Sequence, residues 1–303
     1  MKVAALMLDY DGTIAPLRVP REESRIFRNV ENQLRRIVKQ VPVCVVTAKD
    51  FAFVHPRSRF ASGWACVSGL DVRTVDGRAV GRKKLGSLEP ARKLAKSFEL
   101  LGSYTELKRG PAGEVLAVGI DWSGVPGLGP SIVRRLRSMG GGGRTVIHER
   151  RTTFADIYAA PPDKGYATKL LKNLLEVQGD VMFIGDSAMD DSAFQRAGIA
   201  VGVAHGQPVD RLKCEYLVEQ PRLAEFLRSL SDRGMDFSPR IAWLRRKGGV
   251  TNRESRRGHV PDQPDEGPGT GGPADGQGVQ TPGARGIPDY ERLPRRGAGP
   301  VHR

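Results

Sequence analysis

Cysteine, histidine and aromatic residues are scarce in this 303-residue chain, which has 3 Cys, 5 His and 6% aromatic residues. Cys44, Cys66 and Cys214 form no C-x-x-C pair and have no histidine at ligand spacing, which argues against a disulfide framework and against a zinc site. No apolar run reaches the roughly 18 residues that a membrane-spanning helix needs. The opening M-K-V-A-A-L-M-L-D reaches an acid before a signal-peptide core is complete, so we expect a cytoplasmic protein.

Acidic residues are outnumbered, and the formal net charge is +14. Such an excess points either to nucleic acid or to an anionic substrate. Residues 1–235 hold 36 of the 48 Lys and Arg residues and 26 of the 34 Asp and Glu residues, so most of the excess lies there. No recognisable nucleic-acid module accompanies it. We therefore expect no nucleic-acid partner, with a basic nucleic-acid-binding protein as the alternative.

Short apolar runs alternate with amphipathic segments along the first and last parts of residues 1–235. V-A-A-L-M-L (3–8), V-P-V-C-V-V (41–46) and V-M-F-I (181–184) have the continuous apolar character of strands buried on both faces of a parallel sheet. The spacing of apolar residues predicts a helix over 22–39. These units predict an α/β fold with a Rossmann-like parallel-sheet core.

A segment of different pattern interrupts this core. Residues 86–159 read as helix, strand, strand, twice over, which predicts a small inserted α+β cap domain. The core would then comprise residues 1–85 and 160–235. Residues 236–303 are rich in Gly, Pro and Arg, and we expect this tail to be largely disordered, because it cannot bury enough apolar surface to offset its ordering entropy.

Polar residues follow the predicted core strands where each one ends. Asp9 follows residues 3–8, Thr47 follows 41–46, and Asp186 comes just after 181–184, while Lys164 begins a predicted helix. Ligands of open α/β sheets bind beyond the carboxyl ends of the strands. We therefore expect these side chains to meet at one edge of the sheet.

This set of side chains suits phosphoryl transfer. A phosphate dianion repels a carboxylate nucleophile, so a hard cation such as Mg²⁺ is expected to neutralise charge. We assign Asp9 as nucleophile and metal ligand and Asp186 as a second metal ligand. Lys164 and Thr47 would hold the phosphoryl oxygens. Asp11 would protonate the leaving oxygen and then activate water.

The same residues, in this order, resemble the motifs of the haloacid dehalogenase superfamily. D-Y-D-G-T (9–13) looks like its first motif, Thr47 its second, Lys164 its third and G-D-S-A-M-D-D (185–191) its fourth, with the insert placed as in members with a C2-type cap. Within that branch the chain looks most like trehalose-6-phosphate phosphatases. The resemblance implies Mg²⁺-dependent hydrolysis of a small phosphorylated sugar, with a metal site formed by Asp9, Asp11, Asp186 and Asp190.

Several alternatives stay open. A sugar phosphomutase would use the same Asp9 and Asp11, and a degenerate member would serve only interaction. Asp190 and Asp191 are also plausible N-caps of the helix that follows, and family spacing alone favours Asp190 as the supporting carboxylate. The second motif, T-A-K-D, departs from the common S-G-R, and Ser187 stands where an acid is frequent.

The insert offers few firm assignments. Most of its Lys and Arg residues, Lys108 among them, are expected on solvated faces. Its carboxylates Glu106, Glu114, Asp121 and Glu149 are candidate partners of sugar hydroxyls. The identity of the sugar and the oligomeric state do not follow from the sequence.

Overall fold

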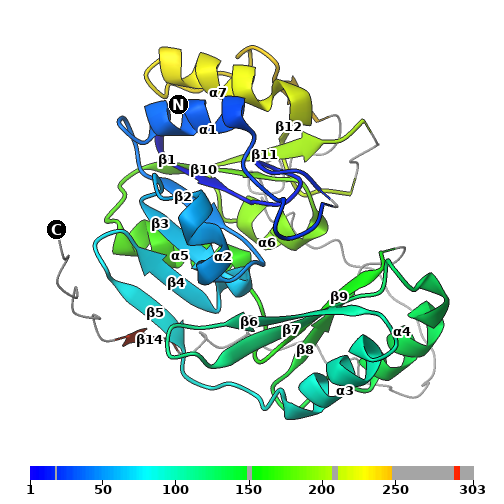
Figure 1. Ribbon diagram of the computed structural model, residues 1–303. Coiled ribbons are helices and arrows are strands. Elements are labelled where there is room, and N and C mark those ends of the chain that lie inside the picture. Colours follow the sequence, from blue (N-terminus) through cyan, green and yellow to red (C-terminus); the bar gives the residue numbers. More distant parts are fainter. Residues whose placement is uncertain (18, 149–151, 207–210, 248–289, 294–303) are drawn as a thin grey trace, which may run out of the picture. The chain divides into compact units, whose positions relative to one another are not determined.

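A ten-stranded sheet forms the larger part of the protein (Figure 1). The computed structural model describes residues 1–17, 19–148, 152–206, 211–247 and 290–293. The strand order is β13-β12-β11-β10-β1-β2-β3-β4-β5-β14. The six parallel strands are β12 (Tyr216–Glu219), β11 (Ile199–Ala204), β10 (Asp180–Gly185), β1 (Val3–Leu8), β2 (Val43–Val46) and β3 (Gly63–Cys66).

Antiparallel strands complete both ends of this sheet. They are β4 (Asp71–Thr74), β5 (Ala79–Arg82) and β14 (Tyr290–Leu293) at one end and β13 (Arg245–Arg246) at the other. Both edges of the sheet are therefore formed by segments from the end of the chain.

Helices cover the two faces of the sheet. Helices α1 (Arg28–Ile37) and α7 (Leu223–Asp232) pack together on one face, and α5 (Lys164–Leu174) and α6 (Asp191–Phe194) lie on the other (Figure 1). Alternate residues of β1 serve both layers, because Leu6 and Leu8 join the core under α1 while Met7 joins the core under α5. This layered arrangement confirms the predicted α/β fold.

A separate antiparallel sheet forms the inserted part (Figure 1). Its order is β6 (Tyr104–Arg109), β7 (Val115–Asp121), β9 (Phe154–Tyr158) and β8 (Thr145–Ile147). Helices α3 (Glu89–Glu99) and α4 (Gly129–Arg137) share an apolar core with one of its faces. The insert thus has the predicted α+β character. The domain boundaries at 85/86 and 159/160 stay a prediction, because residues 1–247 belong to one compact unit.

The structure differs from the sequence-based expectation in two segments. The predicted helix over 22–39 is wrong at its start, since α1 begins only at Arg28. The backbone N–H of Phe27 instead donates to Ile14 O at 3.0 Å, which is a loop contact. Strands β3, β4 and β5 were not predicted, because each has 4 residues, which is too short to show a clear periodicity.

The C-terminal segment is described only in part. Phe237 and Ile241 are buried in the core under α7, and β13 follows them. The backbone of β14 pairs with β5. Residues 248–289 and 294–303, on which most of the predicted disorder falls, lie outside the described residues.

Among the described residues, no helix combines the length and the apolar character that crossing a membrane requires. Cys44, Cys66 and Cys214 are buried free thiols.

Candidate active site

Lys164 is buried between two carboxylates at the carboxyl ends of β1 and β10. It is the first residue of α5, whose N-cap Asp163 accepts a hydrogen bond from the backbone of Tyr166. Its Nζ donates to Asp9 Oδ1 at 2.7 Å and to Asp190 Oδ1 at 2.6 Å. Buried charges are tolerated when they are paired and hydrogen-bonded in this way. Lys164 therefore holds Asp9 and Asp190 in fixed positions.

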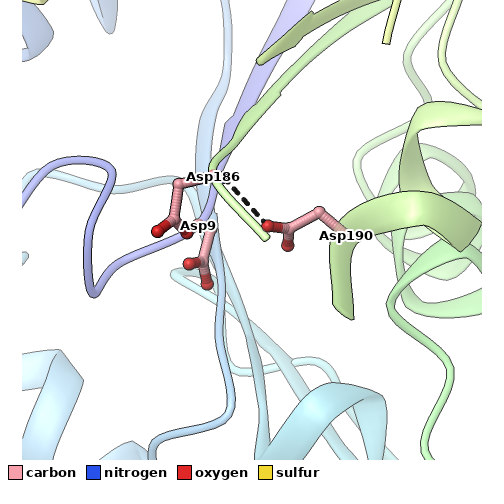
Figure 2. Close-up of side chains that lie close together, drawn as sticks. All are labelled: Asp9, Asp186 and Asp190. Carbon is pink, nitrogen blue, oxygen red and sulfur yellow. Dashed lines mark hydrogen bonds between the residues drawn. The ribbon is translucent and has the colours of Figure 1, made fainter. Parts of the chain in front are cut away.

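Asp190 is the most completely held of the acids. It is fully buried at the end of the 3-10 turn Ala188–Asp190. Its Oδ2 accepts from the backbone N–H groups of Asp186 and Ser187, both at 3.1 Å, and Figure 2 shows the first of these bonds. Ser187 and Asp190 together form a capping box. In the sequence G-D-S-A-M-D (185–190), Asp190 therefore fixes the loop that bears Asp186.

Asp186 completes a cluster of three carboxylates (Figure 2). One oxygen from each of Asp9, Asp186 and Asp190 lies within 4.8 Å of the others. Gly12 allows this approach, because it has φ +75° and a Cβ placed there would lie 2.1 Å from Asp186 Oδ2. His205 Nε2 lies 3.5 Å from the same oxygen of Asp186. The cluster therefore requires a residue without a side chain at position 12, in the loop after β1.

The electrostatics of this cluster favour a bound cation. Burial raises the pKa of Asp9 well above its ordinary value; Lys164 opposes this, while Asp190 and Asp186 add to it. Burial also raises the pKa of Asp186. Burial alone would lower the pKa of Lys164, but Asp190 and Asp9 raise it above its ordinary value. Three carboxylates face one ammonium, so a divalent cation would balance the charge.

The chemistry of the donors fits Mg²⁺. Carboxylate oxygens are hard ligands of the kind that Mg²⁺ prefers, and it commonly retains waters in addition to one or two carboxylates. The space left by Gly12 keeps the Asp186 carboxylate inside the cluster. Asp9, Asp186 and Asp190 are therefore the residues that could hold the ion.

Thr47 and Asp11, the two other predicted site residues, lie outside the carboxylate cluster. Thr47 is buried, and its Oγ1 accepts from the backbone of Lys49 at 3.1 Å, which leaves its hydroxyl proton available for donation. The Asp11 side chain is about one-third exposed, with Lys49 Nζ 3.4 Å from its Oδ2. Its other oxygen lies 3.5 Å from Ser24 Oγ. The structure thus does not place the Asp11 carboxylate with the other three predicted metal ligands.

Asp191 also lies outside the cluster. Its Oδ1 accepts from the backbone of Lys213 at 2.9 Å. Both residues line a cavity of about 290 Å³ beside Lys164, together with Ser68, Pro162 and Gln195. This volume is close to the lower end of the range for ligand pockets, roughly 300–1,000 Å³.

A buried polar network joins the second sheet to the core. Lys108 Nζ donates to both carboxylate oxygens of Asp156, at 2.7 and 2.6 Å. Tyr158 OH donates to Asp156 Oδ2 at 3.0 Å and lies 3.1 Å from Ser68 Oγ of the core. Burial alone would lower the pKa of Lys108, but Asp156, Glu106 and more distantly Asp11 raise it. The polar face of the second sheet therefore faces the predicted site, and Lys108 is an exception to the expected solvated basic residues.

Arg21 makes a second connection between the two sheets. One terminal nitrogen donates to Asp50 Oδ1 and Oδ2, at 3.1 and 3.0 Å, and the other donates to Glu106 Oε1. Asp50 is also the N-cap of α2 (Phe51–Val54), where it accepts from Phe53 N. Sequence reasoning missed Arg21 and Asp156, because no local pattern indicates a partner so far along the chain.

Comparison of the sequence with known proteins identifies distant relatives. No family model matches the chain. An uncharacterized glycosyl hydrolase of Mycobacterium tuberculosis is 27% identical over 244 residues, which cover 71% of this chain but 18% of that protein. A trehalose-phosphate phosphatase of Mycobacterium marinum is 25% identical over 250 residues, 73% of this chain and 60% of that protein. The chain thus spans less than two-thirds of the length of either relative.

Solved structures similar to this chain include two that illustrate the shared fold. The C-terminal domain of the Candida albicans trehalose-6-phosphate phosphatase has a TM-score of 0.63 at 15% identity, over 76% of this chain and 92% of that one. A phosphatase of the haloacid dehalogenase superfamily from Bacteroides thetaiotaomicron has a TM-score of 0.53 at 14% identity, over 78% and 96%. The chain therefore has the fold of the haloacid dehalogenase superfamily, and its structural neighbours there include trehalose-6-phosphate phosphatases.

Proposed function

We propose that the protein is a Mg²⁺-dependent phosphatase that hydrolyses a phosphorylated sugar of the trehalose 6-phosphate class. The observation that carries this proposal is the buried cluster in which Lys164 pairs with Asp9 and Asp190 while Asp186 lies within reach of both. The similarity to phosphatases, some of them named for trehalose 6-phosphate, supports the substrate class.

In the proposed reaction, Asp9 is the nucleophile. One of its carboxylate oxygens attacks phosphorus, the bond from phosphorus to the sugar oxygen breaks, and Asp11 gives its proton to that oxygen. Lys164 and Thr47 donate to the phosphoryl oxygens as charge spreads over them. Bound Mg²⁺ would neutralise charge on the phosphoryl group and on the acids that hold it.

The second half of the reaction regenerates the enzyme. Water attacks the phosphorus of the aspartyl-phosphate, Asp11 takes a proton from that water, and the bond from Asp9 to phosphorus breaks to release inorganic phosphate. The partial exposure of Asp11 suits this exchange of protons with water and substrate. The buried position of Asp9 instead suits a group that forms a covalent bond and is shielded from bulk water.

The experiment is a measurement of inorganic phosphate release from a panel of phosphate monoesters. The panel contains trehalose 6-phosphate, sucrose 6-phosphate, mannosyl-3-phosphoglycerate and hexose phosphates, each with Mg²⁺ and with chelator. We expect Mg²⁺-dependent release from one disaccharide phosphate. Asp9→Asn should abolish it while the protein stays folded, whereas Asp232→Asn, at an exposed ion pair with Arg36, should retain it. An active Asp9→Asn variant would refute the mechanism, and isomer formation without phosphate release would indicate a mutase.

A further inference from the structure

The three clustered carboxylates are held in different ways. Asp9 and Asp190 both accept from Lys164, and Asp190 also accepts from two backbone N–H groups. Among the described residues, His205 is the one whose side-chain donor lies within ion-pairing distance of the Asp186 carboxylate. The orientation of Asp186 therefore depends on a contact that neither of the other two carboxylates shares.

The fold brings His205 to this position. It follows β11, which runs parallel to β10 with Gly202 opposite Gly185, so the residues after both strands extend over the same edge of the sheet. The imidazole is about one-third exposed and lies beside the backbone of Gly12. His205 and the bare backbone of Gly12 thus both lie beside the same oxygen of Asp186, Oδ2.

We propose that His205 is a positioning residue for the metal site. Its Nε2 lies 3.5 Å from Asp186 Oδ2, and a proton donated from there would fix the orientation of the carboxylate within the cluster. The inference rests on the proposed function, because it takes Asp186 to be a metal ligand. Groups that hydrogen-bond a liganding carboxylate fix its orientation, and their removal typically weakens metal binding by about 10- to 100-fold. The 3.5 Å separation and the partial exposure point to the lower end of that range.

The test is a titration of the purified full chain with Mn²⁺, followed by electron paramagnetic resonance of the free ion. Mn²⁺ is a suitable probe because it takes the same oxygen ligands as Mg²⁺. We expect His205→Ala to raise the dissociation constant about tenfold, with the melting temperature of the metal-free protein unchanged. His205→Gln places an amide N–H near the position of Nε2 and should bind within about twofold of the unaltered protein. His205→Asn, whose amide is too short, should behave like His205→Ala.

Two further variants separate the possible failures. His55→Ala removes an imidazole that packs against Phe51 and Trp64, and it should leave Mn²⁺ affinity unchanged. Asp186→Asn should weaken binding more than His205→Ala does. If Asp186→Asn weakens binding and His205→Ala does not, the role of His205 is refuted while the metal site stands. If the unaltered protein and Asp186→Asn bind Mn²⁺ equally, the metal site and the role of His205 both fall.

Discussion

Replacing Lys164 with Met should expose how much the buried ion pairs contribute to stability. The substitution keeps the length of the side chain and removes the only ammonium that hydrogen-bonds Asp9 and Asp190 in the described structure. Lys164 lowers the pKa of Asp9 against the effect of burial, so its removal should raise that pKa further. At neutral pH, Asp9 would then either remain as an unpaired buried charge or take up a proton.

The size of the effect follows from the second possibility. Protonating a carboxyl group whose unfolded-state pKa is about 3.9 requires about 4 kcal/mol at pH 7 and about 1.5 kcal/mol at pH 5, at 1.36 kcal/mol per pH unit. These values are upper limits on the deficit of the variant, because burial already raises the pKa of Asp9 in the unaltered protein. Breaking a buried ion pair typically destabilises a protein by about 3–5 kcal/mol, which agrees with the first value. A carboxyl group with a raised folded-state pKa destabilises the folded protein at pH values above its unfolded-state pKa. This destabilisation decreases as the pH falls towards that value. The deficit of Lys164→Met should therefore shrink between pH 7 and pH 5, by at most about 2–3 kcal/mol.

The assay is urea unfolding of both proteins in chelator at pH 7 and pH 5, with the difference between them taken at each pH. Lys169→Met, on an exposed position of the same helix, is the matched control and should change stability by less than about 0.5 kcal/mol. A Lys164→Met deficit below about 1 kcal/mol at pH 7 would contradict the reasoning. A large deficit that does not change with pH would contradict it too, since a loss of packing alone does not titrate.

Two further substitutions test the loop and the contact between the sheets. Gly12→Ala should abolish Mg²⁺-dependent phosphate release and Mn²⁺ binding, because its Cβ would overlap the Asp186 carboxylate, and retention of both would show that the loop relaxes freely. Arg21→Ala should lower stability by about 1–2 kcal/mol, since Asp50 and Glu106 lose charge-assisted hydrogen bonds. It should also speed hydrogen exchange in β6; exchange unchanged in β6 would mean that Arg21 does not join the two sheets.

The centre of the fold and the position of the site were accessible from the sequence. The run V-A-A-L-M-L can be buried only between two layers, and parallel strands all present their carboxyl ends at one edge. Asp9, Lys164 and Asp186 therefore had to lie near one another once the strands were identified. That argument needs only local patterns and a general rule of sheet topology.

The contacts that the second sheet makes could not be predicted from the sequence in the same way. Alternation along β6 places Glu106 and Lys108 on one face, but it does not say whether that face meets water or another part of the chain. Glu106 meets Arg21, which lies 85 residues away, and Lys108 meets Asp156, which lies 48 residues away. His205 was missed for a related reason, because a single histidine after a strand matches no pattern until the neighbouring strand is known.

The surroundings of Phe53 bear on the positive charge of the chain. The guanidinium groups of Arg21 and Arg57 lie 4.4 and 4.0 Å from the centre of this ring, and Lys49 Nζ lies 5.3 Å from it. Lys49 and Arg21 also contact acids of the site and the second sheet, Asp11 and Glu106. These three cations lie beside three carboxylates, Asp11, Asp50 and Glu106, so the charges around the ring balance and do not form a positive field. A surface that binds nucleic acid would instead spread unpaired cations along an exposed face to follow the phosphate backbone, so these paired side chains do not indicate such a surface.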